Sequence, residues 1–243
     1  MRLSFLSGHQ KNRQIERSFL ISMRRRYAFC PISKVANSSI KAFLLEAEAK
    51  SFGLPMKGLA SSKRNVHDLT YGTLLRPFQF PKQQLQNILT SGKYTRFVFV
   101  RDPVARLVSC YLDRVKTVDS VPHREVTKGL GKAIGAEISF KEFVEFVAGQ
   151  DIIEMNPHWR PQYYEGFLDK IEYDHVLRLE NFQHDMGEIL TKLYPKIAND
   201  INVARNFSPS KTDASEKKQD FVDSGMKALI EEIYKVDMEH LGY

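Results

Sequence analysis

The sequence predicts an α/β fold in which a central parallel sheet is flanked by helices on both faces. The chain has 243 residues, enough for one large core, and no Pro-, Gly- or Ser-rich linker divides it. Several short runs of β-branched and aromatic residues are typical of buried strands. The runs are followed by turns and stretches with helical periodicity, the order that builds parallel sheets. We expect one domain over residues 1–243, with its core at about 27–243 and an N-terminal extension over 1–26.

The first expected strand covers residues 27–32, a short apolar run that follows three arginines. A polar turn leads from it into a helix whose apolar residues between 40 and 47 share one face. Residues 51–81 are rich in Gly, Ser and Pro, and we expect them to be irregular. Pro81 suits the opening of a short helix that ends near Ser91.

The second expected strand covers residues 96–100 and ends at a helix start. Asp102 is a good N-cap residue, and Pro103 fits the first turn. Residues 116–137 are polar, and we expect a surface excursion there. The remaining expected elements are a helix with Phe140, Phe143, Val144 and Val147 inward, a strand over 175–179, a helix over about 181–193, and a last helix over about 215–236 with Phe221, Met226, Leu229, Ile230 and Ile233 inward.

The composition narrows the function only in part. The net charge of +7 favours an anionic ligand, but it does not distinguish a nucleotide from nucleic acid, an acidic glycan or a membrane surface. Cys30 and Cys110 lie in apolar stretches, and we expect buried free thiols in a reduced compartment. The apolar run at residues 1–6 is short for a signal peptide, and no stretch reaches the roughly 18 apolar residues of a membrane span. We therefore expect a soluble, cytoplasmic protein with at most peripheral membrane contact.

The turn from Ser33 to Ser39 has the features of an anion site. It precedes a helix, whose first N–H groups and macrodipole attract negative charge. Lys34 adds a positive charge, and Ser38 and Ser39 add hydroxyl donors. The turn is P-loop-like, but it lacks the Gly-x-x-x-x-Gly-Lys-Ser/Thr spacing, which disfavours a magnesium-dependent NTPase. Taken alone, the turn also fits an ordinary helix start with a solvated lysine.

A second polar turn begins at Arg101, at the carboxyl end of its strand. Ligands of open α/β sheets bind at that edge. Ser109 follows eight residues later, a little over two helical turns, which lets it face the same cleft. A guanidinium with a hydroxyl suits a phosphate group. Taken singly, Arg101 also fits a strand-end salt bridge and Ser109 a small helix residue, but both turns in this order favour a phosphate ligand.

Residues 31–41 (PISKVANSSIK) and 97–111 (FVFVRDPVARLVSCY) carry a family resemblance. They resemble the 5′-phosphosulfate loop and the 3′-phosphate segment of the Golgi-type carbohydrate sulfotransferases, sulfotransferase family 2. Residues 156–162 are similar to the family's His-Trp-x-Pro segment, and 233–243 to its closing Tyr-x-x-Asp…Gly-Tyr. The resemblance spans roughly residues 27–243. Ser33, Asn37 and Ile40 stand where the family has Pro, Cys and Trp, and the cysteine-rich acceptor segment and membrane anchor of the animal enzymes are not seen.

The resemblance implies a sulfotransferase that uses 3′-phosphoadenosine-5′-phosphosulfate (PAPS) as donor and a hydroxyl of a saccharide or glycolipid as acceptor. Transfer is expected to be in-line and metal-free, through a loose transition state like that of phosphoryl transfer. Lys34 would stabilise the leaving phosphate oxygen, and Arg101 and Ser109 would hold the 3′-phosphate. The 5′-phosphate cradle would consist of Val35, Ala36, Asn37, Ser38 and Ser39.

Two further predictions concern the loops. His67 lies between the two phosphate turns, where related sulfotransferases place a catalytic histidine, and a pKa near 6.5 suits a general base. It also fits a plain surface histidine; His158 is its rival, and Asp68 and Glu165 are weaker choices. The loop over 206–211 resembles a family stretch near the nucleotide, and we expect Ser210 and Lys211 to contact PAPS there. An exposed basic loop explains the same residues.

Two other functions stay open at this point. An ATP-dependent phosphotransferase would need magnesium-holding carboxylates near the loop, and no clear Walker-type pair is visible. A non-catalytic binder of an anionic polymer would need clustered basic and aromatic residues, whereas the basic residues here are scattered, so we expect no nucleic acid partner. The run Arg24 to Arg26 suits an acidic acceptor or lipid headgroups, although a solvated charge run is the more usual explanation. The sequence leaves the acceptor hydroxyl and the oligomeric state open.

Overall fold

The computed structural model describes residues 15–54, 74–201 and 212–243, which fall into two compact units. The first unit holds the described residues up to Val100 together with 170–201. The second unit holds residues 101–169 and 212–243. Each unit therefore combines segments that are far apart in the sequence. The single domain over 1–243 stays a prediction.

A mixed four-stranded sheet forms the centre of the first unit. The strands lie in the order β1 (Leu20–Ser22), β2 (Tyr27–Cys30), β3 (Thr95–Val100) and β4 (His175–Arg178). The pairs β2–β3 and β3–β4 are parallel, as predicted. However, β1 runs antiparallel to β2. The prediction that residues 1–26 are only an extension is thus wrong for β1, which the tight turn before Arg26 (φ 52°) folds back onto the sheet.

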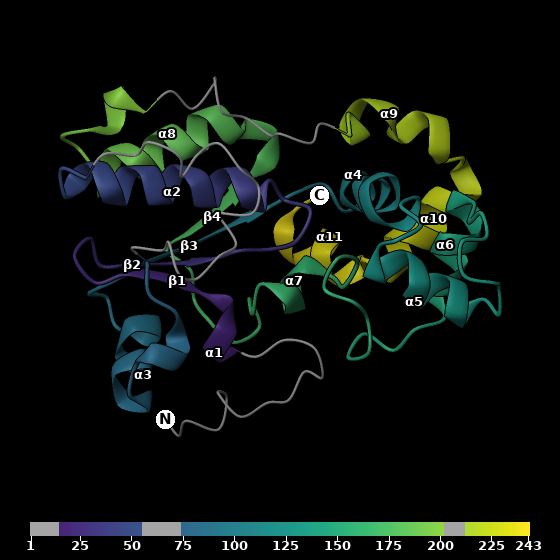
Figure 1. The fold of residues 1–243 in the computed structure, drawn as a ribbon, viewed down its shortest axis with the longest axis horizontal. Helices are drawn as coiled ribbons and strands as arrows, with labels where there is room; N and C mark the ends of the chain where they lie inside the picture. The colour runs from purple at the N-terminus through teal and green to yellow at the C-terminus, as the bar shows by residue number, and fades with distance from the viewer. Residues whose placement is uncertain (1–14, 55–73, 202–211) are drawn as a thin grey trace. The chain divides into compact units, whose positions relative to one another are not determined.

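Helices cover both faces of this sheet, which confirms the predicted fold class (Figure 1). One face carries α2 (Asn37–Ser51) and α8 (Phe182–Leu193), and the other carries α1 (Ile15–Ser18) and α3 (Lys82–Thr90). Phe182 of α8 packs 5.6 Å from Phe99 of β3 and 6.0 Å from Phe43 of α2, between ring centroids. Short 3-10 turns complete the unit: η3 (Pro77–Gln79), η5 (Leu179–Asn181) and η6 (Ala198–Asp200).

Two of the three runs predicted as strands, those that form β2 and β3, are buried because both faces of the sheet are covered there. All residues of β2 and nearly all of β3 are buried. Phe29 and Phe97 are register partners, and their rings stack at a centroid distance of 5.1 Å. Burial on both faces explains why these strands appear in the sequence as continuous apolar runs and not as alternating ones.

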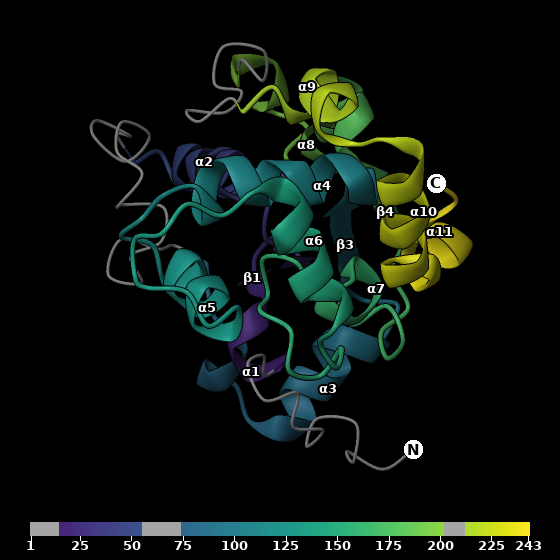
Figure 2. The same ribbon diagram turned by 90° about the vertical axis from the view of Figure 1, so that its right-hand side faces the viewer.

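The second unit is helical. Its elements are α4 (Pro103–Cys110), the π-helical turn η4 (Tyr111–Val115), α5 (Val121–Gly129), α6 (Phe140–Ala148), α7 (Gln162–Glu165), α9 (Ala214–Phe221), α10 (Ser224–Ile233) and α11 (Lys235–Leu241). Figure 2 shows α4, α6 and α10 gathered together. Val108, Phe143, Trp159, Ile230 and Tyr234 are fully buried in their shared core.

Two expectations for the second unit are wrong. Residues 116–137 contain the helix α5, whose start is fixed where Ser120 Oγ accepts a hydrogen bond of 3.0 Å from the N–H of His123. The last helix is split into α9, α10 and α11. Asp223 ends the continuity because its carboxylate caps α10, accepting from the N–H of Met226 at 2.8 Å. Both changes are set by capping residues that a periodicity pattern does not register.

Candidate active site

The loop between β2 and α2 holds two residues in left-handed backbone conformations. Lys34 has φ 67° and Ala36 has φ 45°. Neither is glycine, and each such conformation costs about 1–2 kcal/mol. Strain of this kind persists only where surrounding structure enforces it, and it gathers at ligand-binding loops. Val35, between them, is 1% exposed and anchors the loop in the core.

This conformation leads into a helix start that favours an anion. Ala36 is the N-cap of α2 and has no side chain that can accept from the first N–H groups. The first turn contains no acidic residue. Backbone N–H groups and the positive end of the helix dipole thus meet beside Lys34, as an anion-binding loop requires.

Arg101 and Ser109 both bond to the segment that opens α9. Arg101 Nη2 donates to Ser215 Oγ at 3.0 Å, and Ser109 Oγ lies 3.1 Å from Thr212 Oγ1. Arg101 is 8% exposed and Ser109 is 4% exposed. The structure therefore gathers the two predicted residues around one short segment, and it adds two hydroxyls to them. A guanidinium with three hydroxyls is a suitable donor set for a phosphate.

The backbone of Arg101 is held by the side chain of Gln162. Gln162 Oε1 accepts from the N–H of Arg101 at 2.9 Å, and Gln162 Nε2 donates to the Arg101 carbonyl at 2.7 Å. Asp237 in turn accepts from the backbone N–H groups of Gln162 and Tyr163, both at 2.8 Å. Burial raises the pKa of Asp237, while these two N–H groups and Arg106 act in the opposite direction.

Residues 156–162 and 233–243, the two segments with a weaker family resemblance, contact each other in this network. Tyr234 donates its hydroxyl proton to the Trp159 carbonyl at 2.6 Å, and Trp159 is fully buried. Arg160 and Glu165 form an ion pair of 3.3 Å in which neither side chain is exposed. Glu165 is therefore engaged in a buried ion pair, which argues against it as a base.

His158 is the histidine base candidate that the structure describes. It is half-buried, and its Nδ1 lies 2.8 Å from Asn156 Oδ1. Because that amide oxygen only accepts, Nδ1 carries the proton and Nε2 is the basic nitrogen. Asn156 Nδ2 donates to Glu125 Oε2 at 2.6 Å, and burial raises the pKa of Glu125. His67, Asp68, Ser210 and Lys211 lie outside the described residues.

Sequence reasoning missed four residues of this arrangement: Thr212, Ser215, Gln162 and Asp237. Thr212 comes directly after the loop over 206–211 that was expected near the nucleotide, and that expectation stays a prediction. Gln162 and Asp237 lie within the two segments of weaker family resemblance, but no neighbouring residue in the sequence indicates a link from either of them to Arg101. Their partners are 61 and 75 residues away in the chain.

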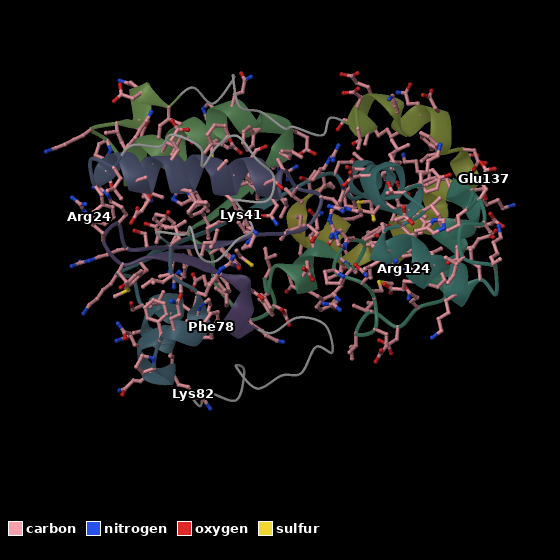
Figure 3. All side chains as sticks on the ribbon, viewed as in Figure 1. Arg24, Lys41, Phe78, Lys82, Arg124 and Glu137 are labelled. Carbon is pink, nitrogen blue, oxygen red and sulfur yellow. The ribbon has the colours of Figure 1, made fainter. Side chains whose placement is uncertain are left out.

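The arginine run lies at the turn between β1 and β2, where Figure 3 labels Arg24. The Arg24 guanidinium carbon lies 4.4 Å from the centroid of the Phe52 ring, and that of Arg25 lies 5.2 Å from the Tyr194 ring. These contacts are cation–π geometry, so two of the three arginines stack on aromatic rings of the protein itself. A role for the run toward acidic acceptors or lipids stays a prediction.

The comparisons with known proteins settle the family. The sequence profile described as "Sulfotransferase family" matches residues 17–243. The chain belongs to the sulfotransferase family. Its mixed sheet with helices on both faces is the P-loop-like α/β arrangement that the sequence predicted.

Curated relatives of this chain are carbohydrate sulfotransferases. Carbohydrate sulfotransferase 14 of Mus musculus is 29% identical over 197 residues, which cover 74% of this chain and 47% of the relative. Carbohydrate sulfotransferase 12 of Xenopus laevis is 25% identical, covering 93% of this chain and 59% of the relative. Carbohydrate sulfotransferase 9 of Homo sapiens is 26% identical, covering 90% and 52%. The chain thus spans about half the length of these relatives. No solved structure matches it.

The relatives also correct one prediction. The expectation of a cytoplasmic protein is wrong, because the relatives are carbohydrate sulfotransferases, which are Golgi-type enzymes. Cys30 and Cys110 are buried and free, as predicted, but burial alone accounts for that state, and it says nothing of the compartment. Over residues 15–54, 74–201 and 212–243, no helix has both the length and the apolar character needed to cross a membrane.

Proposed function

We propose that this chain transfers the sulfuryl group of PAPS to a hydroxyl of a carbohydrate or glycolipid acceptor. The observation that carries the proposal is the donor set in which Arg101 bonds to Ser215 and Ser109 bonds to Thr212. This donor set suits a phosphate group, and a 3′-phosphate is the feature that separates PAPS from ordinary adenine nucleotides. Membership of the sulfotransferase family and the names of the relatives support the same reaction.

The proposed reaction is a direct in-line transfer. The acceptor oxygen forms a bond to sulfur while the bond from sulfur to the bridging phosphate oxygen breaks. The acceptor proton passes to a base, and 3′-phosphoadenosine-5′-phosphate (PAP) leaves with the electron pair of the broken bond. Positioning and charge stabilisation supply most of the catalysis in such loose transition states.

In this reaction the loop after β2 binds the 5′ end of the donor. Lys34 stabilises the charge that develops on the leaving oxygen. The backbone from Val35 to Ser39, with the hydroxyls of Ser38 and Ser39, cradles the 5′-phosphate. The left-handed residues at 34 and 36 support this assignment, because they orient successive N–H groups toward an anion.

The 3′-phosphate binds Arg101 and Ser109, and we extend this set to Thr212 and Ser215. Their hydroxyls already contact the two predicted residues at hydrogen-bond distance. Ser210 and Lys211 remain proposed contacts to the nucleotide.

The general base is proposed to be His67, with His158 as the alternative. His158 has in its favour an orienting hydrogen bond from Nδ1, which leaves Nε2 as the basic atom. Replacing the base with alanine should lower the transfer rate about 10²- to 10⁴-fold without changing the Kd for PAP. His67→Ala and His158→Ala, compared in the same assay, decide between them.

Transfer is proposed to need no metal. In the described ranges 15–54, 74–201 and 212–243, no group of three or more His, Cys, Asp or Glu side chains is placed to hold one. Full activity in the presence of a chelator is the expected result. A magnesium requirement would favour an ATP-dependent phosphotransferase.

The proposal is tested by calorimetric binding of PAP and of adenosine 5′-phosphate, which differ only in the 3′-phosphate. Wild-type protein should prefer PAP. Arg101→Ala should reduce PAP affinity about 10- to 100-fold and leave adenosine 5′-phosphate unchanged, since bonds to charged groups contribute about 1.5–3 kcal/mol. Thr212→Val and Ser215→Ala should each reduce PAP affinity about 2- to 10-fold.

The matched control is Arg114→Ala. Arg114 is a half-exposed arginine of the same unit that forms an ion pair of 3.1 Å with Asp113, so Arg114→Ala removes the same charge without removing a member of the donor set. Its PAP affinity should equal that of the wild type. Equal wild-type binding of the two nucleotides, or binding of neither, would contradict the proposed function.

A further inference from the structure

Gln162 holds the Arg101 peptide from both sides. Its side-chain amide makes two hydrogen bonds to one residue, accepting at 2.9 Å and donating at 2.7 Å. Gln162 is fully buried, so water does not compete for these bonds. The amide fixes the backbone of Arg101 directly after the end of β3. It therefore fixes the position of the Arg101 Cα, from which the guanidinium side chain extends.

Asp237 holds Gln162 in the orientation that this requires. Its Oδ2 accepts from the Gln162 backbone N–H at 2.8 Å and lies 3.4 Å from Gln162 Nε2, while Oδ1 accepts from Tyr163 N–H. With Nε2 directed at two acceptors, the amide cannot rotate by half a turn without placing its oxygen against the Asp237 carboxylate and the Arg101 carbonyl. Asp237 is itself fully buried.

Burying these polar groups would cost free energy without a return if they only filled space in the core. A buried carboxylate loses its hydration, and well-packed apolar side chains of similar volume often replace buried polar groups without loss of stability. What the polar arrangement provides, and apolar residues would not, is a fixed direction for the Arg101 peptide. The side chain of Arg101 then reaches Ser215 at 3.0 Å from that fixed point.

We propose that Gln162, oriented by Asp237, is a positioning residue that places Arg101 for recognition of the donor's 3′-phosphate. This inference rests on the proposed function, in which Arg101 binds that phosphate. Neither Gln162 nor Asp237 touches the donor in this proposal. Both act through Arg101, so their effect should be confined to ligands that carry a 3′-phosphate.

The experiment measures the Kd ratio of adenosine 5′-phosphate to PAP by calorimetry. Gln162→Met keeps the length and volume of the side chain but removes both hydrogen bonds to Arg101. The ratio should fall about 10-fold, through weaker PAP binding, while the Kd for adenosine 5′-phosphate changes less than about twofold. In an Arg101→Ala background, Gln162→Met should change the Kd for PAP less than about twofold, because the guanidinium through which Gln162 acts is absent.

Asp237→Asn is the second variant, used if Gln162→Met does not give a folded protein. It keeps the shape of the side chain but turns an N–H group toward one of the two backbone N–H donors, so the ratio should fall by a smaller factor in the same direction. Tyr234→Phe is the matched control. It removes a buried hydrogen bond to Trp159, adjacent to the same network, without touching Arg101 or Gln162. Its ratio should equal that of the wild type.

The outcomes separate the two proposals. A wild-type preference for PAP that Gln162→Met and Asp237→Asn leave intact would overturn the positioning role alone. Equal weakening of both nucleotides, or an undiminished effect in the Arg101→Ala background, would overturn it as well, because that is the behaviour of a purely structural residue. Absence of any wild-type preference for PAP would instead contradict the proposed function.

Discussion

At the residue scale, the proposed site depends on conformations that side-chain identity does not reveal. Lys34 and Ala36 adopt left-handed backbone angles that glycine usually supplies. The loop contains no glycine, so the buried neighbours Ile32 and Val35, at 2% and 1% exposure, must hold it in place. The type of chemistry, a lysine beside a helix start, was readable from the sequence, whereas the strained geometry was not.

Lys34→Gly should separate the chemical role of Lys34 from its structural one. The rate of sulfuryl transfer should fall about 100-fold or more, because an electrostatic contact to the leaving oxygen is lost. The free energy of unfolding should change by less than about 1 kcal/mol, since glycine adopts φ 67° without strain. Transfer from labelled PAPS and thermal unfolding measure the two effects.

Lys34→Arg is the control for this prediction. It retains the positive charge and should keep more activity than Lys34→Gly. A Lys34→Gly protein with a wild-type rate would show that Lys34 has no part in the transfer.

At the scale of helices and strands, the sequence predicted a helix start correctly where the capping residue stood beside a second local signal. Asp102 caps α4 as predicted, and its Oδ1 accepts from the N–H of Ala105 at 2.6 Å. The cap was readable because a capping residue and a following proline form a local signal. Periodicity failed at Asp223, where one cap divides a run that would otherwise continue as a single helix.

The start of α6 should make stability depend on acid pH. Glu142 accepts from Ser139 in a capping box and pairs with Lys132 at 2.5 Å. Its hydrogen bonds to Lys132 and Ser139 lower its pKa from the ordinary 4.5 to about 2. Because the folded-state pKa is depressed, the stabilisation is present above pH 4.5 and is lost as pH falls toward 2.

Glu142→Gln keeps the capping geometry but removes the titrating charge. Thermal unfolding between pH 7 and pH 2 should therefore show a smaller loss of Tm for Glu142→Gln than for the wild type, with the difference arising below about pH 4.5. Parallel Tm curves for the two proteins over this range would contradict the assignment.

Two helical glycines should respond to alanine in opposite directions. A Cβ at Gly129, at the end of α5, would lie 2.1 Å from Phe146 Cε2, so Gly129→Ala forces the ring to move. It should lower the free energy of unfolding by about 1–3 kcal/mol. Gly187, within α8, has nothing within 4 Å of such a Cβ, so Gly187→Ala should stabilise by about 0.5–1 kcal/mol. Denaturant unfolding measures both, and equal signs would refute the explanation.

At the scale of the whole molecule, donor binding should appear as stability. PAP at about 100 times its Kd should stabilise the folded protein by about 2.7 kcal/mol. For a chain of 243 residues this corresponds to a Tm increase of roughly 5–10 °C. Thermal unfolding with PAP measures it. Adenosine 5′-phosphate at the same concentration should give a smaller increase, and Arg101→Ala should remove the advantage of PAP.

The local features of this protein are predictable from short stretches of its sequence. Strands β2, β3 and β4, the helices α2, α3, α4, α6 and α8, and the position of Lys34 beside a helix start follow from apolar periodicity, caps and charge within short windows. Tertiary structure alone decided that β1 joins the sheet, that Thr212 and Ser215 meet Ser109 and Arg101, and that Gln162 and Asp237 hold the Arg101 peptide. These pairings link segments up to 114 residues apart, and they depend on how helices pack, which no short stretch of sequence encodes.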